Sequence, residues 1–199
     1  MKNIFNYQTS IGRIGIAEED NQITNVFFET DICNNQNYIS KESTGSKEHV
    51  SSKKFADLKE DIVSNNNIAS FKYVEAKDYY FKETETMREA SRQLYEYLEG
   101  KRKIFNLPLA PHGTTFMKSV WNCLCDIPYG KTKSYKEIAK EVGNAKACRA
   151  VGLANNRNPI PIFIPCHRVI GANGKLIGYR GGLKTKLQLL ELEKQYENI

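Results

Sequence analysis

The chain has 199 residues, 40% of them hydrophobic, which is enough for one large domain or two small ones with a buried core. Its five cysteines are an odd number with no Cys-x-x-Cys pair, which disfavours a disulfide framework and a zinc ribbon. No apolar run is long enough to span a membrane, and the N-terminus lacks the hydrophobic region of a signal peptide. We therefore expect a protein of a reducing, intracellular compartment, with no metal and no membrane partner.

The net charge of +6 belongs to the C-terminal part of the chain. Residues 1–109 carry 15 Lys and Arg against 17 Asp and Glu, a balance of −2, whereas residues 110–199 carry 14 against 6, a balance of +8. Such asymmetry favours a phosphate-bearing partner for the C-terminal part. A basic surface that serves only solubility is the alternative.

The N-terminal part reads as short strands followed by a helix. The β-branched and aromatic runs Ile4–Tyr7, Ile14–Ala17 and Ile23–Phe28, separated by Gly, Asp and Asn, predict an antiparallel sheet. The polar stretch 34–70 predicts a loosely organised insertion with one helix near Phe55–Val63. A further helix is predicted over Met87–Leu98, ended by Gly100.

The segment Leu107–Gly113, with its two prolines, reads as a linker, and we place the domain boundary there. The prediction is an α+β protein with two domains. Residues 1–109 form a small N-terminal α/β companion domain, an antiparallel sheet plus a helix. Residues 110–199 form a mostly helical domain.

The C-terminal part begins with an amphipathic helix, whose apolar stripe is Phe116, Val120, Cys123, Leu124 and Ile127. A capping box at Ser134–Glu137 opens a second helix that runs through Val142. A third helix is expected from about Lys146 to Asn155, after the tight turn at Gly143. Two short helices joined in this way predict a helix-turn-helix in a winged-helix-like domain.

The third helix has two different faces. We expect one face, made of Ala147, Ala150, Val151 and Ala154, to pack inside the domain. The other face carries Arg149, Gly152, Leu153 and Asn156. Small residues beside one long Arg let a helix backbone approach a ligand closely while a single side chain enters a narrow groove. A solvated Arg on a helix surface is the plainer interpretation.

The hexapeptide Ile164–Val169 places Cys166 between a proline and the pair His167-Arg168. Basic and cationic neighbours lower the pKa of a thiol from about 8.5 and favour the nucleophilic thiolate. We therefore predict that Cys166 is reactive. The other cysteines are expected only to pack: Cys33, Cys123, Cys125 and Cys148.

From about Phe116 to Glu193 the chain resembles the O6-alkylguanine-DNA alkyltransferases, also called methylated-DNA–protein-cysteine methyltransferases. Six stretches carry the resemblance, in the expected order: Ile127-Pro128-Tyr129-Gly130, Ser134-Tyr135, Arg149-Ala150-Val151-Gly152, Asn158-Pro159, the Cys166 hexapeptide, and Gly178-Tyr179-Arg180-Gly181-Gly182-Leu183. The resemblance implies repair of double-stranded DNA by direct damage reversal. An O6-alkylguanine is flipped out and its alkyl group passes irreversibly, in a single turnover, to Cys166.

The resemblance also implies a role for each site residue. Cys166 would accept the alkyl group, His167 would act as its base through a water, and Glu193 would orient His167. Glu193 lies on a last helix that we expect to pack through Leu183, Leu187 and Leu190. Tyr135 would donate a proton toward the base and help to rotate the phosphate.

The remaining roles concern the loop and the DNA. Asn158 would tie the active-site loop to the recognition helix, although an Asn before a Pro is also ordinary turn chemistry. Arg149 would fill the space left by the flipped base, with Ala150 and Gly152 facing DNA. Tyr179 and Arg180 would line the substrate pocket. The family implies no cofactor, activity as a monomer, and a cytoplasmic, nucleoid-associated location, or a nuclear one in a eukaryote.

Two other functions remain open from the residues alone. A cysteine hydrolase could use Cys166 and His167, but such enzymes bring their His from a distant segment, and only His49 and His112 remain. A helix-turn-helix protein that only binds DNA explains the basic half but gives no reason for the Pro-Cys-His-Arg run. Activity on O4-alkylthymine and on larger alkyl groups is left open.

Overall fold

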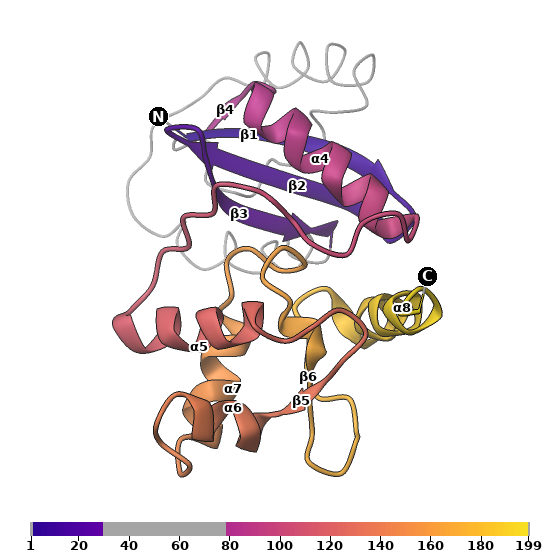
Figure 1. Cartoon of the computed structure of the whole chain (residues 1–199). Coiled ribbons are helices and arrows are strands. Elements are labelled where there is room, and N and C mark those ends of the chain that lie inside the picture. The colour runs from indigo at the N-terminus through magenta and orange to yellow at the C-terminus, as the bar shows by residue number, and fades with distance from the viewer. Residues whose placement is uncertain (1, 30–78, 199) are drawn as a thin grey trace, which may run out of the picture.

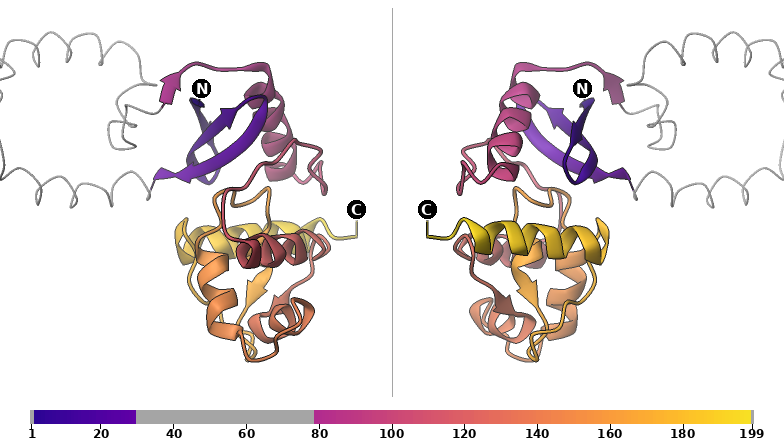
Figure 2. Two further views of the ribbon diagram at one scale, coloured as in Figure 1. Left: turned by 90° about the vertical axis from the view of Figure 1, so that its left-hand side faces the viewer. Right: turned by 90° about the vertical axis from the view of Figure 1, so that its right-hand side faces the viewer.

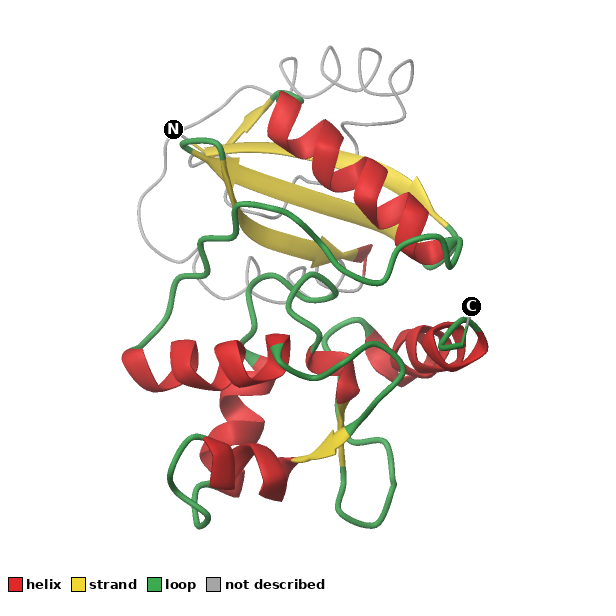
Figure 3. Cartoon of the chain, in the orientation of Figure 1, coloured by secondary structure: helices red, strands yellow, loops and turns green. Residues whose placement is uncertain are grey.

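The computed structural model describes residues 2–29 and 79–198, so the helix expected near Phe55–Val63 lies outside the described residues. A sheet with one helix forms the N-terminal part, and a mostly helical part follows it (Figure 1). Figure 3 shows the same division by type of secondary structure. The α+β class predicted from the sequence is confirmed.

The N-terminal sheet has four strands in the order β3-β2-β1-β4. The three predicted strands form an antiparallel meander and are longer than expected. A short fourth strand, which the sequence did not predict, pairs in parallel with the first. The bounds are β1 Lys2–Thr9, β2 Gly12–Glu19, β3 Gln22–Phe28 and β4 Tyr79–Phe81.

Helix α4 (Glu85–Leu98) lies across one face of this sheet (Figure 1). It begins two residues before the predicted start, because Thr84 caps it by accepting a hydrogen bond from the backbone N–H of Met87. Its buried face packs on the sheet in one continuous core. That face includes Met87, Ala90, Leu94 and Tyr97.

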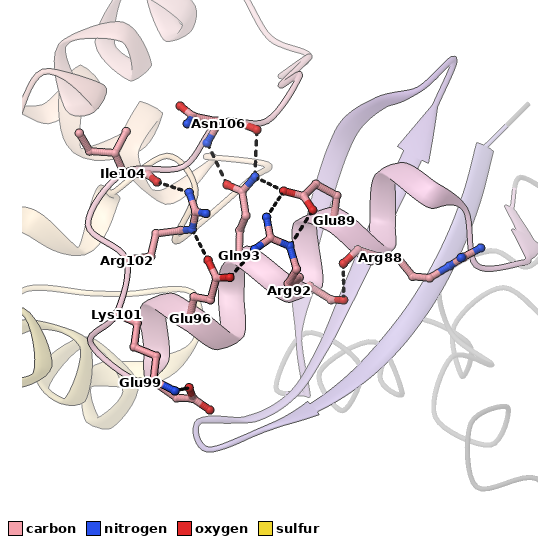
Figure 4. Close-up of polar contacts among 11 residues, drawn as sticks. Arg88, Glu89, Arg92, Gln93, Glu96, Glu99, Lys101, Arg102, Ile104 and Asn106 are labelled. Carbon is pink, nitrogen blue, oxygen red and sulfur yellow. Dashed lines mark hydrogen bonds and ion pairs between the residues drawn. The ribbon is translucent and has the colours of Figure 1, made fainter.

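The outer face of α4 is charged and holds the following segment against the helix (Figure 4). Arg92 pairs with Glu89 at 2.6 Å and also with Glu96. The Gln93 side chain accepts a hydrogen bond from the backbone N–H of Asn106 at 2.9 Å and donates one to its carbonyl at 3.0 Å. The chain therefore turns back along α4 before it enters the C-terminal part.

The C-terminal part contains four helices and a two-stranded parallel pair within the described residues. The capping box at Ser134 is present, and Gly143 adopts a φ of 81°, which permits the tight turn between the second and third helices. Trp121 is buried and donates a hydrogen bond to the carbonyl of Ala154 at 2.9 Å. The predicted helix-turn-helix is thus present. The bounds are α5 Thr115–Cys125, β5 Lys133–Ser134, α6 Tyr135–Glu141, α7 Cys148–Asn156, β6 Val169–Ile170 and α8 Gly182–Gln195.

Helix α8 does not pack through the face that we expected. Leu183 and Leu187 are 50% and 44% exposed. The buried residues of this helix are Thr185, Lys186, Leu189 and Glu193. The leucine periodicity was misleading because the buried polar groups of α8 find partners in the adjacent loop, which makes their burial possible.

The two parts are joined by backbone hydrogen bonds along β3. The N–H of Val26 donates to the carbonyl of Pro159 at 2.8 Å, and Ile23 exchanges hydrogen bonds with the carbonyl of Pro108 and the N–H of Ala110. The predicted linker is therefore partly paired with the sheet edge. The side views in Figure 2 show the sheet above the helical part, with α8 running beneath it. Among the described residues, none of the helices has the length and apolar character needed to cross a membrane.

Candidate active site

Cys166 begins a single 3-10 turn, Cys166–Arg168, at the end of the loop that follows α7. The side chain is 3% exposed. Ile162 in the same loop has a φ of 76°, a left-handed conformation that is strained for a β-branched residue. Strain of this kind is kept where surrounding contacts over-determine the backbone, and it gathers at functional sites.

Two buried asparagines hold this loop. The Asn158 side chain donates to the carbonyl of Ile164 at 2.9 Å and accepts from the N–H of Ile160 at 3.0 Å, so it closes the loop from both ends. Asn155 on α7 donates to the carbonyl of Cys166 at 3.3 Å. The Cys166 turn is therefore tied directly to α7 by Asn155, while Asn158 closes the loop itself.

The thiol of Cys166 is protonated at neutral pH, whereas its neighbours in the sequence suggested a thiolate. Burial raises its pKa to about 11, although a hydrogen bond from Asn158 and the positive charges of Lys186 and Arg180 oppose the rise. The side chains of His167 and Arg168 bond to Glu193 instead. The expectation of a lowered pKa was wrong because His167 and Arg168, although next to Cys166 in the sequence, direct their side chains toward Glu193.

The other cysteines occupy varied surroundings. Cys123 and Cys148 are half-buried, whereas Cys125 is exposed, so the prediction that it packs is wrong. Cys33 lies outside the described residues.

Glu193 forms the centre of a buried polar cluster. Its Oε1 lies 2.9 Å from His167 Nε2, and both side chains are completely buried. Arg168 donates to the same carboxylate from Nε and Nη2, at 3.0 and 2.8 Å, and from Nη1 to the carbonyl of Ile127 at 2.6 Å. The backbone N–H of Gly130 donates to Glu193 Oε2 at 3.0 Å.

This cluster fixes the protonation states of its members. Burial raises the pKa of Glu193, but the hydrogen bonds and charges of His167 and Arg168 outweigh burial and lower it to about 2. Burial lowers the pKa of His167 despite the neighbouring carboxylate. A neutral His167 thus faces an ionised Glu193 through Nε2. Its Nδ1 is buried and has no hydrogen-bond partner among the described residues, so it is the nitrogen available to accept a proton.

A hollow of about 410 Å³ opens beside α7. Its lining includes Tyr135, Cys148, Gly152, Asn155, Asn156, Ile177 and Gly178. A larger hollow of about 610 Å³ lies along α4 and contains none of the predicted site residues. The hollow beside α7 is therefore the better candidate for the entry of a base.

The predicted DNA-facing residues lie on the exposed side of α7. Arg149 and Ala150 are exposed, and Gly152 lies beside the Tyr135 ring, where an added Cβ would make an ordinary contact at 3.9 Å. The prediction that Ala150 packs inside the domain is wrong, because the turn of α7 buries Val151, Ala154 and Asn155 instead.

Tyr135 stays protonated at neutral pH. Burial and the neighbouring Cys166 raise the pKa of its hydroxyl, while a hydrogen bond with Asn155 opposes them. A protonated phenol at the rim of the hollow is able to donate a proton to a bound base.

Profiles of protein families match both parts of the chain. Residues 6–111 match the "6-O-methylguanine DNA methyltransferase, ribonuclease-like domain", and residues 115–195 match the "6-O-methylguanine DNA methyltransferase, DNA binding domain". The chain belongs to the 6-O-methylguanine DNA methyltransferase family.

Named relatives agree with this assignment. The methylated-DNA–protein-cysteine methyltransferase of Methanosarcina acetivorans is 62% identical over 61% of this chain and 78% of its own length. The constitutive enzyme of Bacillus subtilis is 40% identical over 94% of this chain and 92% of its own. The crystal structure of Mycobacterium tuberculosis OGT in complex with DNA is 34% identical, with a TM-score of 0.70, and covers 98% of this chain and 94% of that one.

Within this methyltransferase, Tyr179 and Arg180 lie next to the predicted site rather than among the residues named for the hollow. The Tyr179 ring meets His167 edge-on, with 6.4 Å between centroids, and also meets Phe28 of β3. Arg180 lies over the Phe27 ring at 5.9 Å, and its charge acts on the Cys166 thiol.

Sequence reasoning missed two buried polar residues of this methyltransferase. Lys186 is fully buried and donates to the carbonyls of Val169 and Ile177 at 2.6 and 2.9 Å. Burial lowers its pKa to about 8. The second residue is Tyr97 on α4, which the sequence placed only within the predicted helix Met87–Leu98. A buried Tyr hydroxyl needs a partner, and that requirement is the signal that could have revealed it.

No group of three or more His, Cys, Asp or Glu is placed to hold a metal ion in the described parts of the chain.

Proposed function

We propose that this chain repairs double-stranded DNA by transferring the alkyl group of O6-alkylguanine to Sγ of Cys166. The observation that carries the proposal is a buried thiol on a turn whose next two residues bond to one ionised carboxylate, in a chain of the 6-O-methylguanine DNA methyltransferase family. Relatives named methylated-DNA–protein-cysteine methyltransferases and the DNA complex of the Mycobacterium tuberculosis protein support the reaction and the DNA partner.

The proposed reaction begins with a protonated thiol. His167 Nδ1 takes the proton of Cys166 through a water, and Glu193 stabilises the imidazolium that forms, because it already faces Nε2. The sulfur then attacks the alkyl carbon, and the C–O6 bond breaks with its electron pair left on the guanine. Tyr135 donates a proton to the base. A thioether and an unmodified guanine result.

Burial of the sulfur requires the base to leave the duplex. A thiol that is 3% exposed cannot reach O6 of a stacked base, so the guanine has to rotate into the hollow beside α7. Arg149, exposed at the start of α7, is proposed to occupy the space that the base leaves, while Ala150 and Gly152 allow close approach of the helix. The +8 balance of residues 110–199 supports binding to the phosphate backbone.

A thioether has no good leaving group, so the protein is expected to act once. We propose that it acts as a monomer, because one chain supplies all the proposed site residues. Because its substrate is DNA, the proposed location is the cytoplasm at the nucleoid, or the nucleus in a eukaryote. The same displacement would apply to the O4-alkyl group of O4-alkylthymine.

Mass spectrometry of the intact protein tests the proposal. After mixing with duplex DNA that contains O6-methylguanine, we expect the protein to gain the mass of one CH2 group, located on the peptide with Cys166. Excess DNA should give no more than one equivalent of repaired base per protein. An unchanged mass would contradict transfer to this chain, and repeated turnover would favour a hydrolase.

Arg149 offers a separate test of base rotation. Replacing Arg149 by Ala should slow transfer from duplex DNA on the order of tenfold, because the rotated state loses the side chain that stabilises it. Transfer from the free base O6-methylguanine, which needs no rotation, should be unchanged. Arg157→Ala, an exposed charge just past the other end of α7, is the matched control. Equal slowing by both substitutions would indicate only a loss of general charge attraction.

A further inference from the structure

One partner of the buried carboxylate comes from the N-terminal part of the chain. Tyr97, in the last turn of α4, donates its hydroxyl to Glu193 Oε1 at 2.6 Å. The hydroxyl oxygen of Tyr97 also lies 3.3 Å from His167 Nε2. All three side chains are fully buried. A residue 70 positions from His167 in the sequence therefore contacts the proposed base directly.

Only one placement of the protons on Tyr97 and His167 is consistent with these contacts. A phenol has a single proton, and the 2.6 Å contact with an ionised carboxylate takes it. The Tyr97 oxygen then presents only lone pairs to His167 Nε2. Glu193 Oε1, at 2.9 Å from the same nitrogen, is also an acceptor. Because both neighbours of Nε2 are acceptors, the imidazole proton has to sit on Nε2, which leaves the lone pair on Nδ1.

We propose that Tyr97 is a positioning residue for the transfer reaction, which holds the neutral imidazole of His167 in the Nε2–H form. The inference rests on the proposed function, since it concerns how His167 becomes able to take the Cys166 proton at Nδ1. Tyr97 itself does not touch the thiol or the DNA base in this role.

The surroundings of Tyr97 fit a fixed position. Its ring is wedged between the rings of Phe105 and Tyr129, with centroids 5.1 and 6.0 Å away. Next to the end of α4, Gly100 lies against the ring of Tyr196, where an added Cβ would come within 2.5 Å. Lys103 donates to the carbonyl of Glu197 at 2.9 Å. The end of α4 is thus docked on the end of α8, and the hydroxyl has little freedom to leave the carboxylate (Figure 1).

Tyr129 provides a matched control for Tyr97. It lies in the same aromatic cluster and near Arg168, and its hydroxyl is buried, but that hydroxyl has no hydrogen-bond partner among the described residues. Changing either Tyr to Phe keeps the ring and removes one hydroxyl. Only the Tyr97→Phe change removes a contact with His167 and Glu193.

The test compares four full-length proteins: the unchanged chain, Tyr97→Phe, Tyr129→Phe and Glu193→Gln. Each is assayed for the single-turnover rate with duplex DNA containing O6-methylguanine, for DNA affinity, and for the ¹⁵N signals of the His167 ring. We expect Tyr97→Phe to lower the rate about tenfold with unchanged DNA affinity, as for other partners that orient a functional His. Because Glu193 remains as an acceptor, Tyr97→Phe should keep Nε2–H as its main form but show a fraction of Nδ1–H, whereas the unchanged chain and Tyr129→Phe show Nε2–H alone.

The outcomes separate the inference from the proposed function. A Tyr97→Phe protein with a full rate, or with Nε2–H as its only form, overturns the inference. Equal slowing by Tyr97→Phe and Tyr129→Phe also overturns it, because packing would then be the cause. Glu193→Gln tests the proposed base itself. If that protein also reacts at the full rate, the role of the His167–Glu193 pair fails, whatever Tyr97 does.

Discussion

A Cys166→Ala protein is expected to bind duplex DNA containing O6-methylguanine with unchanged affinity and to gain no mass from it. In the proposed reaction the sulfur is the only atom that receives the alkyl group, so its removal eliminates transfer. The proposed DNA contacts come from α7, whose exposed face is independent of the thiol. Binding is measured by fluorescence anisotropy, and transfer by intact mass.

Cys148→Ala is the control for this experiment. Cys148 lines the hollow beside α7 and is the thiol that a base entering this hollow would also meet. We expect Cys148→Ala to keep full transfer. If Cys166→Ala still gains mass, and the gain disappears when Cys148 is also changed, then Cys148 is the acceptor. That result would refute the assignment to Cys166. A Cys166→Ala protein that no longer binds DNA would show that the thiol is needed for the fold of the site.

Glu193→Gln is expected to be the most damaging conservative change in the chain. The amide keeps the size of the side chain but removes the charge that balances Arg168, which is only 6% exposed. Removing one partner of a buried ion pair costs about 3–5 kcal/mol, because the other charge stays buried without compensation. We expect a loss of this size in the free energy of unfolding from urea denaturation at pH 7. Glu191→Gln, an exposed position on α8, should change it little.

The pH dependence of stability provides a second test that Glu193 is ionised in the folded protein. The pKa of Glu193 is lowered to about 2 in the folded protein, below about 4.3 for an unfolded Glu. The carboxylate therefore adds stability that is fully present above the unfolded value and is lost as the pH falls toward 2. The difference in the free energy of unfolding between the unchanged chain and Glu193→Gln should become smaller as the pH falls from about 4.3 to about 2. A gap that stays constant down to pH 2 would mean that Glu193 is not ionised in the fold.

Local sequence patterns were sufficient to predict the elements whose structure depends on residues nearby in the sequence. The β-branched and aromatic runs of β1, β2 and β3 and the capping box at Ser134 depend on neighbours within a few positions, and each was predicted. Strand β4 could not be predicted in this way. It has three residues, and it is a strand only because β1, more than seventy positions earlier, supplies its hydrogen bonds.

Side-chain direction at the site also depended on tertiary contacts. The leucines of α8 had the spacing of a buried face, yet the burial of Lys186 and Glu193 was decided by the carbonyls of Val169 and Ile177 and by Arg168. Arg168 looked like an activator of the thiol because it is two positions from it. In the fold it neutralises Glu193 instead. The candidate site residues were proposed from their motifs, but their electrostatic surroundings required the coordinates.

The high pKa of Cys166 has a consequence for a protein that is used once. With a thiol pKa of about 11, only on the order of 10⁻⁴ of the molecules carry a thiolate at neutral pH. Peroxides, disulfides and small electrophiles react with thiolates, so they find almost none in the resting protein. An exposed cysteine with an ordinary pKa carries more thiolate and would react with such reagents faster. Burial therefore protects the single acceptor of this chain from side reactions until it meets its substrate.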